Sequence, residues 1–296
     1  NADKAGYTRK ELQVNYLTTN TGSTPVSGLV VGTADKFLVR AAVGDISTYS
    51  RDNVISASLD YYNKQLGNTA GTNTLSSYLD DMYATLQYLA TNPETSANKS
   101  EVITTAESMT GSLRDLSANI QKLRLDAEQK IGTSINTINS LLDQIDAYND
   151  QITDGGNNDA SLAEFQDQRN AALQSLSAEL DVQYFYTTDN RLQIYTRSGN
   201  ALLLSDPHHI NYTTTNVVNG TISYPVNFSA IDLDGIDLTT TLSNGKLAGY
   251  VQLRDTTYPD EQEKLNEFTS VLQTQVNTLL NTGASVAARD TITGSL

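Results

Sequence analysis

Apolar side chains recur at steps of three and four residues through most of 101–152, which is the spacing of one face of an α-helix. A single helix over this stretch would be about 78 Å long at a rise of about 1.5 Å per residue. Between Leu123 and Ile135 three successive steps of four residues shift the apolar seam. The apolar positions of this stripe are Val102, Ile103, Ala106, Met109, Leu113, Leu116, Ile120, Leu123, Ala127, Ile131, Ile135, Ile138, Leu142, Ile145, Tyr148 and Ile152.

Helical spacing also covers four other stretches, at 34–67, 74–91, 161–180 and 259–283. Asn92-Pro93 ends the second stretch, because a proline disfavours helical geometry at the residue before it. Ser161 with Glu164 matches the capping box of a helix N-terminus. The last stretch is expected to end at Gly283, and its apolar positions are Leu265, Phe268, Leu272, Val276 and Leu279.

A period of two residues replaces the helical period after residue 181. Val182, Tyr184 and Tyr186 alternate with other positions, and turn-forming clusters separate further short runs up to about residue 243. A second, N-terminal pair of strands is expected around a turn within 11–33. The pattern therefore predicts a small antiparallel sheet between helices, and a β-hairpin near 11–33.

These elements predict an α+β fold that is mainly α. We expect an elongated helical bundle, formed by 1–180 plus 244–296, with a small antiparallel β domain inserted at 181–243. The last helix is too short to be stable alone in water, so it should close the bundle by packing on the 101–152 stripe. An inserted domain of this kind should be replaceable by a short linker without loss of the helical part.

The charge balance narrows the classes of partner. The chain has 34 acidic and 19 basic residues and a formal charge of -15, which argues against nucleic acid and against an anionic membrane surface. It has no cysteine, so neither disulfides nor thiolate metal sites are expected. No run approaches the roughly 18 apolar residues of a membrane helix.

Candidate chemical sites are weak. Asp232, Asp234 and Asp237 lie close together, but their spacing departs from that of an EF-hand calcium loop, so a turn between strands is the better interpretation. His208 and His209 are the two imidazoles of the chain, and zinc needs three or four ligands. No pattern of nucleophile and base or of a phosphate loop was found, so we expect no catalytic residue, no metal and no cofactor.

Three motifs and one helix, taken together, resemble the flagellar hook-associated protein 1 (FlgK) family. The start, Gly6-Tyr7-Thr8-Arg9, is similar to the Gly-Tyr-Ser-Arg sequence of that family, and the helix that ends in Asn92-Pro93 resembles its Leu-rich helix. Asp167-Gln168-Arg169 resembles a central Asp-Gln-Arg motif. The third motif, similar to Gly-Lys-Leu-Gly-Gly…Arg-Asp, consists of Gly245, Lys246, Leu247, Ala248, Gly249, Arg254 and Asp255.

The resemblance implies a structural, non-enzymatic subunit of the bacterial flagellum that forms the hook–filament junction and serves flagellum assembly and motility. The implied partners are other copies of the subunit in a ring, the hook protein, and hook-associated protein 3. The implied location is extracellular, after type III export without a cleaved signal peptide. The terminal coiled-coil segments of the family have no counterpart here, so we expect a fragment that is monomeric alone. The alternatives are another axial flagellar protein of hook, rod or filament type, or an extracellular glycan-binding adhesin or hydrolase.

Overall fold

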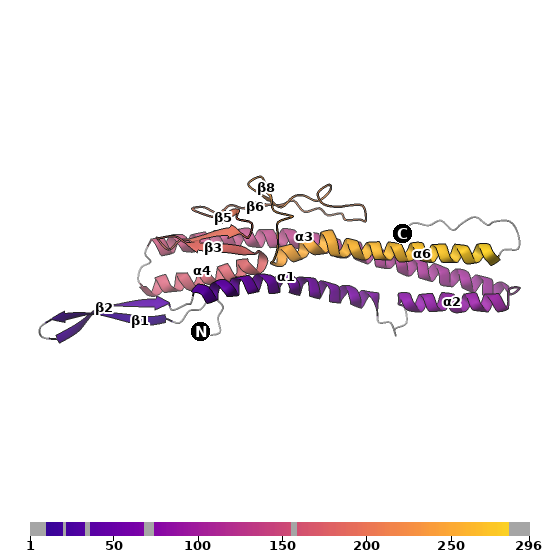
Figure 1. The fold of residues 1–296 in the computed structure, drawn as a ribbon, viewed down its shortest axis with the longest axis horizontal. Coiled ribbons are helices and arrows are strands. Elements are labelled where there is room, and N and C mark those ends of the chain that lie inside the picture. Colours follow the sequence, from indigo (N-terminus) through magenta and orange to yellow (C-terminus); the bar gives the residue numbers. More distant parts are fainter. Residues whose placement is uncertain (1–9, 20–21, 33–35, 68–73, 155–158, 284–296) are drawn as a thin grey trace. The chain divides into compact units, whose positions relative to one another are not determined.

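A computed structural model describes residues 10–19, 22–32, 36–67, 74–154 and 159–283 (Figure 1). In chain order its elements are β1 (Lys10–Thr19), β2 (Gly22–Gly32), α1 (Lys36–Leu66), α2 (Leu75–Thr91), α3 (Ser96–Thr153), α4 (Asp159–Glu179), β3 (Val182–Tyr186), β4 (Leu192–Thr196), β5 (Ala201–Leu203), β6 (Ile210–Asn211), β7 (Asp232–Leu233), β8 (Ile236–Asp237), α5 (Lys246–Gln252), the π-helical turn η1 (Leu253–Thr257) and α6 (Tyr258–Gly283). The fold is mainly helical with small antiparallel sheets, as the sequence predicted.

The strands form three separate antiparallel sheets. β1 pairs with β2 at the position of the expected hairpin. β3, β4 and β5 form one three-stranded sheet, and β6, β7 and β8 form another. The strands of the last sheet have two residues each, so this sheet depends on its surroundings for stability.

The chain divides into two compact units. The first unit comprises 1–55, 128–215 and 224–251, and the second comprises 56–127, 216–223 and 252–296. Helices α1 and α3 each contribute residues to both units. Neither unit corresponds to the expected helical domain or to the expected insert, because each unit combines segments from both.

The first unit has one hydrophobic core that helices and strands share. Ile138 and Leu142 of α3, Leu176 of α4 and Ile194 of β4 are all fully buried in it. Leu247 of α5 belongs to the same core. The boundaries expected at 180/181 and 243/244 therefore do not separate two cores, and the strands of 181–243 are not packed as an independent domain. The physical reason is that sheets this small bury too little surface among themselves.

The second unit has buried apolar residues on the C-terminal part of α1, on α2, on the N-terminal part of α3, in η1 and on α6. Its buried apolar residues are Tyr62, Met82, Met109, Leu113, Leu116, Ile120, Ala127, Leu253, Tyr258 and Leu265. The Gln262 side-chain oxygen accepts hydrogen bonds from Ser117 and Gln121, both at 3.0 Å, which joins the start of α6 to α3. The C-terminal helix thus packs on the long helix within this unit (Figure 1).

The buried face of α3 differs from the predicted stripe at several positions, among them Ile103, which is 60% exposed, and Arg124. Arg124 is 3% exposed, whereas the neighbouring Leu123 is only partly buried. With Arg124 in the series, the buried positions continue in steps of three and four between Ile120 and Ile135, where the apolar residues alone step by four residues three times. The buried face of α3 therefore continues through this region, and the gap in its apolar residues is the position that Arg124 occupies.

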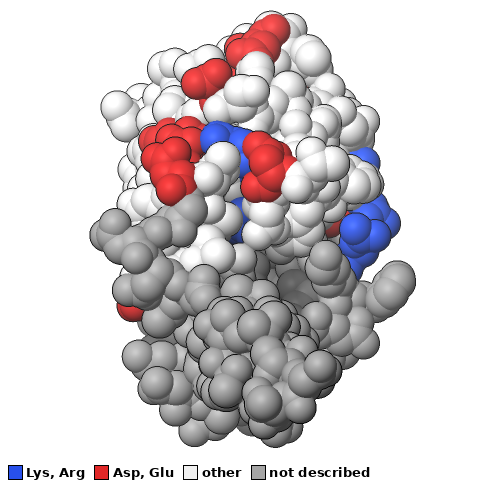
Figure 2. Space-filling model, turned by 90° about the vertical axis from the view of Figure 1, so that its left-hand side faces the viewer, with Lys and Arg blue, Asp and Glu red and all other residues white. Residues whose placement is uncertain are grey.

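The surface carries the acidic excess of the sequence. Figure 2 shows one face on which Asp and Glu side chains lie on both sides of a central basic patch, with further Lys and Arg side chains at one edge. No helix of the described residues is long and apolar enough to cross a membrane.

The shared core predicts the outcome of removing the strands. Replacement of 181–243 by a short Gly/Ser linker should abolish cooperative unfolding of the first unit, because Ile138, Leu142 and Leu176 would lose their apolar partners. This expectation reverses the one that the sequence pattern suggested. Circular dichroism during thermal unfolding checks it. A helical signal that still melts in one sharp transition would show that the helices do not need the strands.

The packing of α6 predicts a graded effect of acidic substitutions along that helix. Leu265→Asp should destabilise the protein by roughly 3 kcal/mol or more, since it places an unpaired carboxylate where the side chain is 8% exposed. Leu272→Asp should cost less, because Leu272 is only partly buried. Val271→Asp is the matched control at a position that is 54% exposed, and should change stability little. Urea unfolding of the three variants gives the order, and equal effects would contradict the packing of α6 on α3.

Candidate functional site

The signature residues fall into three places along the chain. Gly6, Tyr7 and Arg9 lie outside the described residues. Asp167, Gln168 and Arg169 lie on α4, and Gly245, Leu247 and Gly249 lie at or within α5, all in the first unit. Arg254 and Asp255 lie in η1, in the second unit.

Arg169 is a buried cation held by neutral acceptors. Its side chain is 2% exposed, and its guanidinium donates to the Asn149 side-chain oxygen at 2.9 Å and to the Asn190 carbonyl at 2.7 Å. The guanidinium carbon also lies 5.2 Å from the centre of the Tyr186 ring. Burial lowers the pKa of the Arg169 side chain, and among the described residues no carboxylate forms an ion pair with it. Such an arrangement positions the main chain at Asn190 and the side chain of Asn149.

The other two residues of the central motif differ from Arg169 in exposure. Gln168 is exposed and makes one long contact of 3.5 Å with Glu164, one turn earlier on α4. Asp167 is partly buried. Within this motif, Arg169 is therefore the most deeply buried residue.

Asn149 of α3 connects Arg169 to the sheet. Its side-chain oxygen accepts from the Leu192 N–H at 2.9 Å, and its side-chain nitrogen donates to the Leu192 carbonyl at 3.0 Å. Asn139, also on α3, makes the same two-point contact with Ile210, at 2.9 Å in both directions. Each amide thus bonds to a strand residue as a neighbouring strand would. Neither asparagine follows from the apolar pattern of the sequence; Asn149 is a fully buried polar residue that lies four residues after Ile145 on the same helical face.

Gly245 lies where the chain passes closest to the end of α4. Its φ is +88°, and a Cβ atom there would lie 2.5 Å from the Glu179 carbonyl oxygen. Its N–H donates to the Ser47 carbonyl at 2.9 Å, which connects the start of α5 to α1. Both the backbone conformation and the space require glycine at this position.

Buried polar side chains surround this turn. Glu179 accepts hydrogen bonds from Ser134 and Lys246, both at 2.7 Å, and is 8% exposed. Asp181 accepts from the Ser243 hydroxyl and the Asn244 amide, both at 3.1 Å. The two carboxylates thus connect the end of α4 to the residues on both sides of Gly245.

The remaining α5 residues of the motif pack tightly. Leu247 is 0% exposed within the shared core. At Gly249, a Cβ atom would lie 3.2 Å from the Arg51 carbonyl oxygen on α1. Small and apolar residues at these positions therefore allow α5 to lie against α1.

Arg254 and Asp255 form an ion pair inside the second unit. The Arg254 guanidinium donates twice to the Asp255 carboxylate, at 2.8 and 2.7 Å, and its side chain is fully buried. The Arg254 carbonyl accepts from the Arg124 side chain at 3.1 Å. Arg124 also donates to the carbonyls of Asn219 and Ile222 at 3.0 and 2.8 Å, and burial lowers its pKa. These contacts organise the π-helical turn and the 216–223 segment around α3.

Neither the histidines nor the acidic turn forms a metal centre in the described residues. His208 contacts Asp234 at 2.5 Å, and His209 contacts Asp143 at 2.7 Å, as separate pairs. No group of three or more His, Cys, Asp or Glu side chains in the part of the chain that the structure describes could hold a metal ion.

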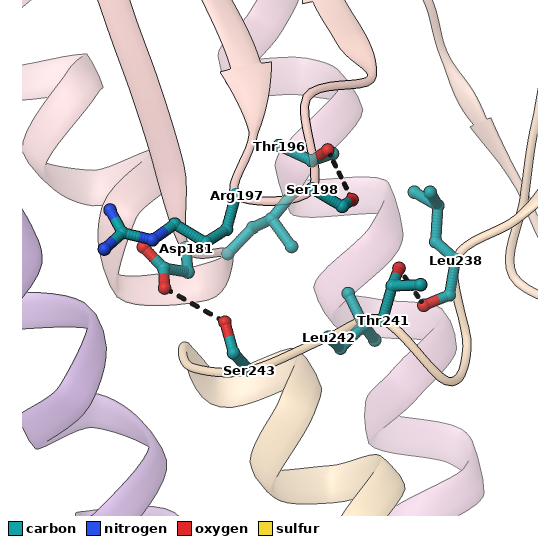
Figure 3. A pocket seen from close by; sticks show the side chains of 9 residues that line it. Asp181, Thr196, Arg197, Ser198, Leu238, Thr241, Leu242 and Ser243 are labelled. Carbon is teal, nitrogen blue, oxygen red and sulfur yellow. Dashed lines mark hydrogen bonds between the residues drawn. The ribbon is translucent and has the colours of Figure 1, made fainter.

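One small hollow lies beside Asp181 in the first unit (Figure 3). It is lined by residues that include Asp181, Arg197, Leu238 and Ser243, and its volume is about 10 Å³. This is the space that one water molecule needs, so the hollow is too small for an organic ligand.

The close approach at Gly245 predicts that adding one methyl group there lowers the stability of the protein strongly. Gly245→Ala should destabilise the protein by roughly 3 kcal/mol, because it adds a clash with the Glu179 carbonyl to a strained backbone. Gly235→Ala is the matched control, since Gly235 has a φ of +85° with nothing within 4 Å of its Cβ position. The control should cost only about 1 kcal/mol. Similar denaturation midpoints for the two variants would show that the close approach to α4 does not matter.

Substitutions of the adjacent residues Gln168 and Arg169 should differ in their effect on stability, because Arg169 is buried and Gln168 is exposed. Arg169→Ala should cost roughly 3 kcal/mol, because it removes the packing of a side chain that is 2% exposed and the donor to the buried Asn149 side-chain oxygen. Gln168→Ala should change stability by less than about 0.5 kcal/mol, as expected of an exposed position. Chemical denaturation checks both, and a harmless Arg169→Ala would contradict the positioning role.

Comparisons with known proteins relate the chain to one family. The family model described as the flagellar hook-associated protein FlgK helical domain matches residues 62–292. The structure is similar to that of the flagellar hook junction protein FlgK from Burkholderia pseudomallei, with a TM-score of 0.64 and 20% sequence identity. The match covers 81% of this chain and 43% of that protein, so the chain spans less than half of its length. The search of curated proteins found no match. Because the family model covers most of the chain, including Arg169, Gly245 and Arg254, the chain belongs to the FlgK family of flagellar hook-associated proteins.

Proposed function

We propose that the chain is part of a structural subunit at the junction between the flagellar hook and filament. The observation that carries this proposal is the match of the FlgK helical-domain model to residues 62–292. The contacts of the signature residues support it. Arg169, Gly245 and Arg254 contact their own unit of the chain, as residues that maintain a fold do.

We propose a mechanical role and no enzymatic one. A junction subunit must hold a fixed shape while it contacts unlike neighbours, so stable helices serve it better than a catalytic cleft. The buried signature residues offer no nucleophile beside a general base, and the hollow beside Asp181 is too small for a substrate.

The proposed partners are further copies of the subunit in a ring, the hook protein, and hook-associated protein 3. The proposed location is outside the cell, after type III export without a cleaved signal peptide. The chain spans 43% of its structural relative, and we propose that this part alone is monomeric.

Deletion of the gene in its own bacterium tests the proposed function. The expected result is cells with hooks but without filaments, which release flagellin into the medium and are non-motile. Electron microscopy of the hooks and an immunoblot of the culture supernatant measure this, and complementation with the full-length gene should restore filaments. Normal filaments in the deletion strain would contradict the proposal. Loss of the hooks as well would assign the protein to an earlier axial segment.

A further inference from the structure

Two Asn-Gly sequences occur in the chain, at Asn219-Gly220 and Asn244-Gly245. In such a sequence the backbone nitrogen of glycine can attack the side-chain amide carbon of asparagine, because glycine offers no side chain that hinders ring closure. The reaction needs the amide carbon to lie near that nitrogen and the nitrogen to be free of other bonds. The two sequences differ in both requirements.

Two hydrogen bonds from Thr221 fold the Asn219 side chain toward the following residues. Its side-chain oxygen accepts from the Thr221 N–H at 2.9 Å and from the Thr221 hydroxyl at 2.8 Å. A bond from the side chain to the N–H two residues later curls the amide over the intervening Gly220 peptide. The same two donors would stabilise negative charge on this oxygen when the nitrogen adds to the carbon.

The Gly220 nitrogen is accessible. Both residues are exposed, and nothing lies within 4 Å of the Gly220 Cβ position. Among the described residues, no group accepts a hydrogen bond from the Gly220 N–H. Water can therefore reach the site to remove the amide proton and to hydrolyse a cyclic product.

At the second sequence, both the Asn244 side chain and the Gly245 nitrogen form hydrogen bonds to other residues. Its side-chain nitrogen donates to the Asp181 carboxylate at 3.1 Å. The Gly245 N–H donates to the Ser47 carbonyl at 2.9 Å, and Gly245 is buried. The nucleophile is therefore occupied, and the amide is bonded to another group.

We propose that Asn219 is a site of spontaneous deamidation in the folded protein, and that the fold protects Asn244. The deprotonated Gly220 nitrogen forms a bond to the Asn219 amide carbon, and the C–N bond of the side-chain amide breaks to release ammonia. Water then opens the resulting five-membered succinimide at one of its two carbonyls. The product is aspartate or isoaspartate at position 219, with one additional negative charge.

The isoaspartate product changes a contact of the second unit. In that product the main chain runs through the former side chain, and the 219 carbonyl that accepts from Arg124 at 3.0 Å becomes part of a free carboxylate. Arg124 is 3% exposed and cannot exchange this acceptor for bulk water. The isoaspartate product therefore reroutes the main chain of the 216–223 segment and places a carboxylate beside Arg124, whereas the aspartate product keeps the carbonyl unchanged.

Prolonged incubation of the purified chain in mildly alkaline buffer tests the proposal. Tryptic digestion gives one peptide that contains both Asn219 and Asn244, because no Lys or Arg lies between Arg197 and Lys246. Fragmentation by tandem mass spectrometry locates the acid at either position. In the folded protein, deamidation at Asn219 should be at least about tenfold faster than at Asn244. In concentrated urea the two rates should become similar, since both sequences are then free.

Two variants separate the causes. Thr221→Ala removes the hydroxyl donor and should slow the reaction at Asn219 in the folded protein while leaving the rate in urea unchanged. Gly220→Ala should slow it in both states, because the methyl group hinders ring closure. The proposal is overturned if Asn219 in the folded chain reacts no faster than Asn244, or if it reacts more slowly than in urea.

Discussion

Side chains of α3 complete the hydrogen bonding of strands that are too short to form stable sheets alone. Asn139 and Asn149 each bond to both the N–H and the carbonyl of one strand residue. Glu128 adds contacts of 2.7 Å to the Tyr212 hydroxyl and 2.9 Å to the Thr215 N–H. An unmet buried main-chain group costs about 1–3 kcal/mol, so these side chains determine where the strands lie along the helix. The shared core of the first unit depends on that register, because a different register would place other residues against Ile138 and Leu142.

The buried arginines show how an acidic chain uses its few cations. Arg124 and Arg169 donate mainly to carbonyl and amide oxygens, and Arg254 pairs with the adjacent Asp255. A guanidinium has several donors in a fixed plane, so it can join segments that are distant in sequence. Carbonyl acceptors also leave the distribution of surface carboxylates unconstrained. The buried arginines therefore stabilise the fold without using the surface carboxylates, so the surface can stay acidic.

Periodicity predicted the elements well, because it reports which face of a helix or strand is apolar. The long helix, the helix before Asn92-Pro93 and the closing helix follow from such stripes. Periodicity could not predict Arg124 or Asn149, since a polar residue in an apolar series signals burial only when its partners are known. It also could not predict the shared core. The change to a period of two at Val182 shows that a strand begins there, but it does not show that a separate domain with its own core begins there. The resemblance located Arg169 and Gly245, but their roles as a buried donor and a close-approach glycine required the coordinates.

The contact between Glu179 and Gly245 closes a loop that contains all the strands from β3 to β8. The entropy lost in closing a loop grows only slowly with its length, so added residues within that loop change the cost of closure little. Exposed positions such as Val226, which is 79% exposed, can therefore accept an insertion while the base at Gly245 is unchanged. Evolution could enlarge the outer part of such a protein, and vary what it presents to its surroundings, without redesigning the helices beneath.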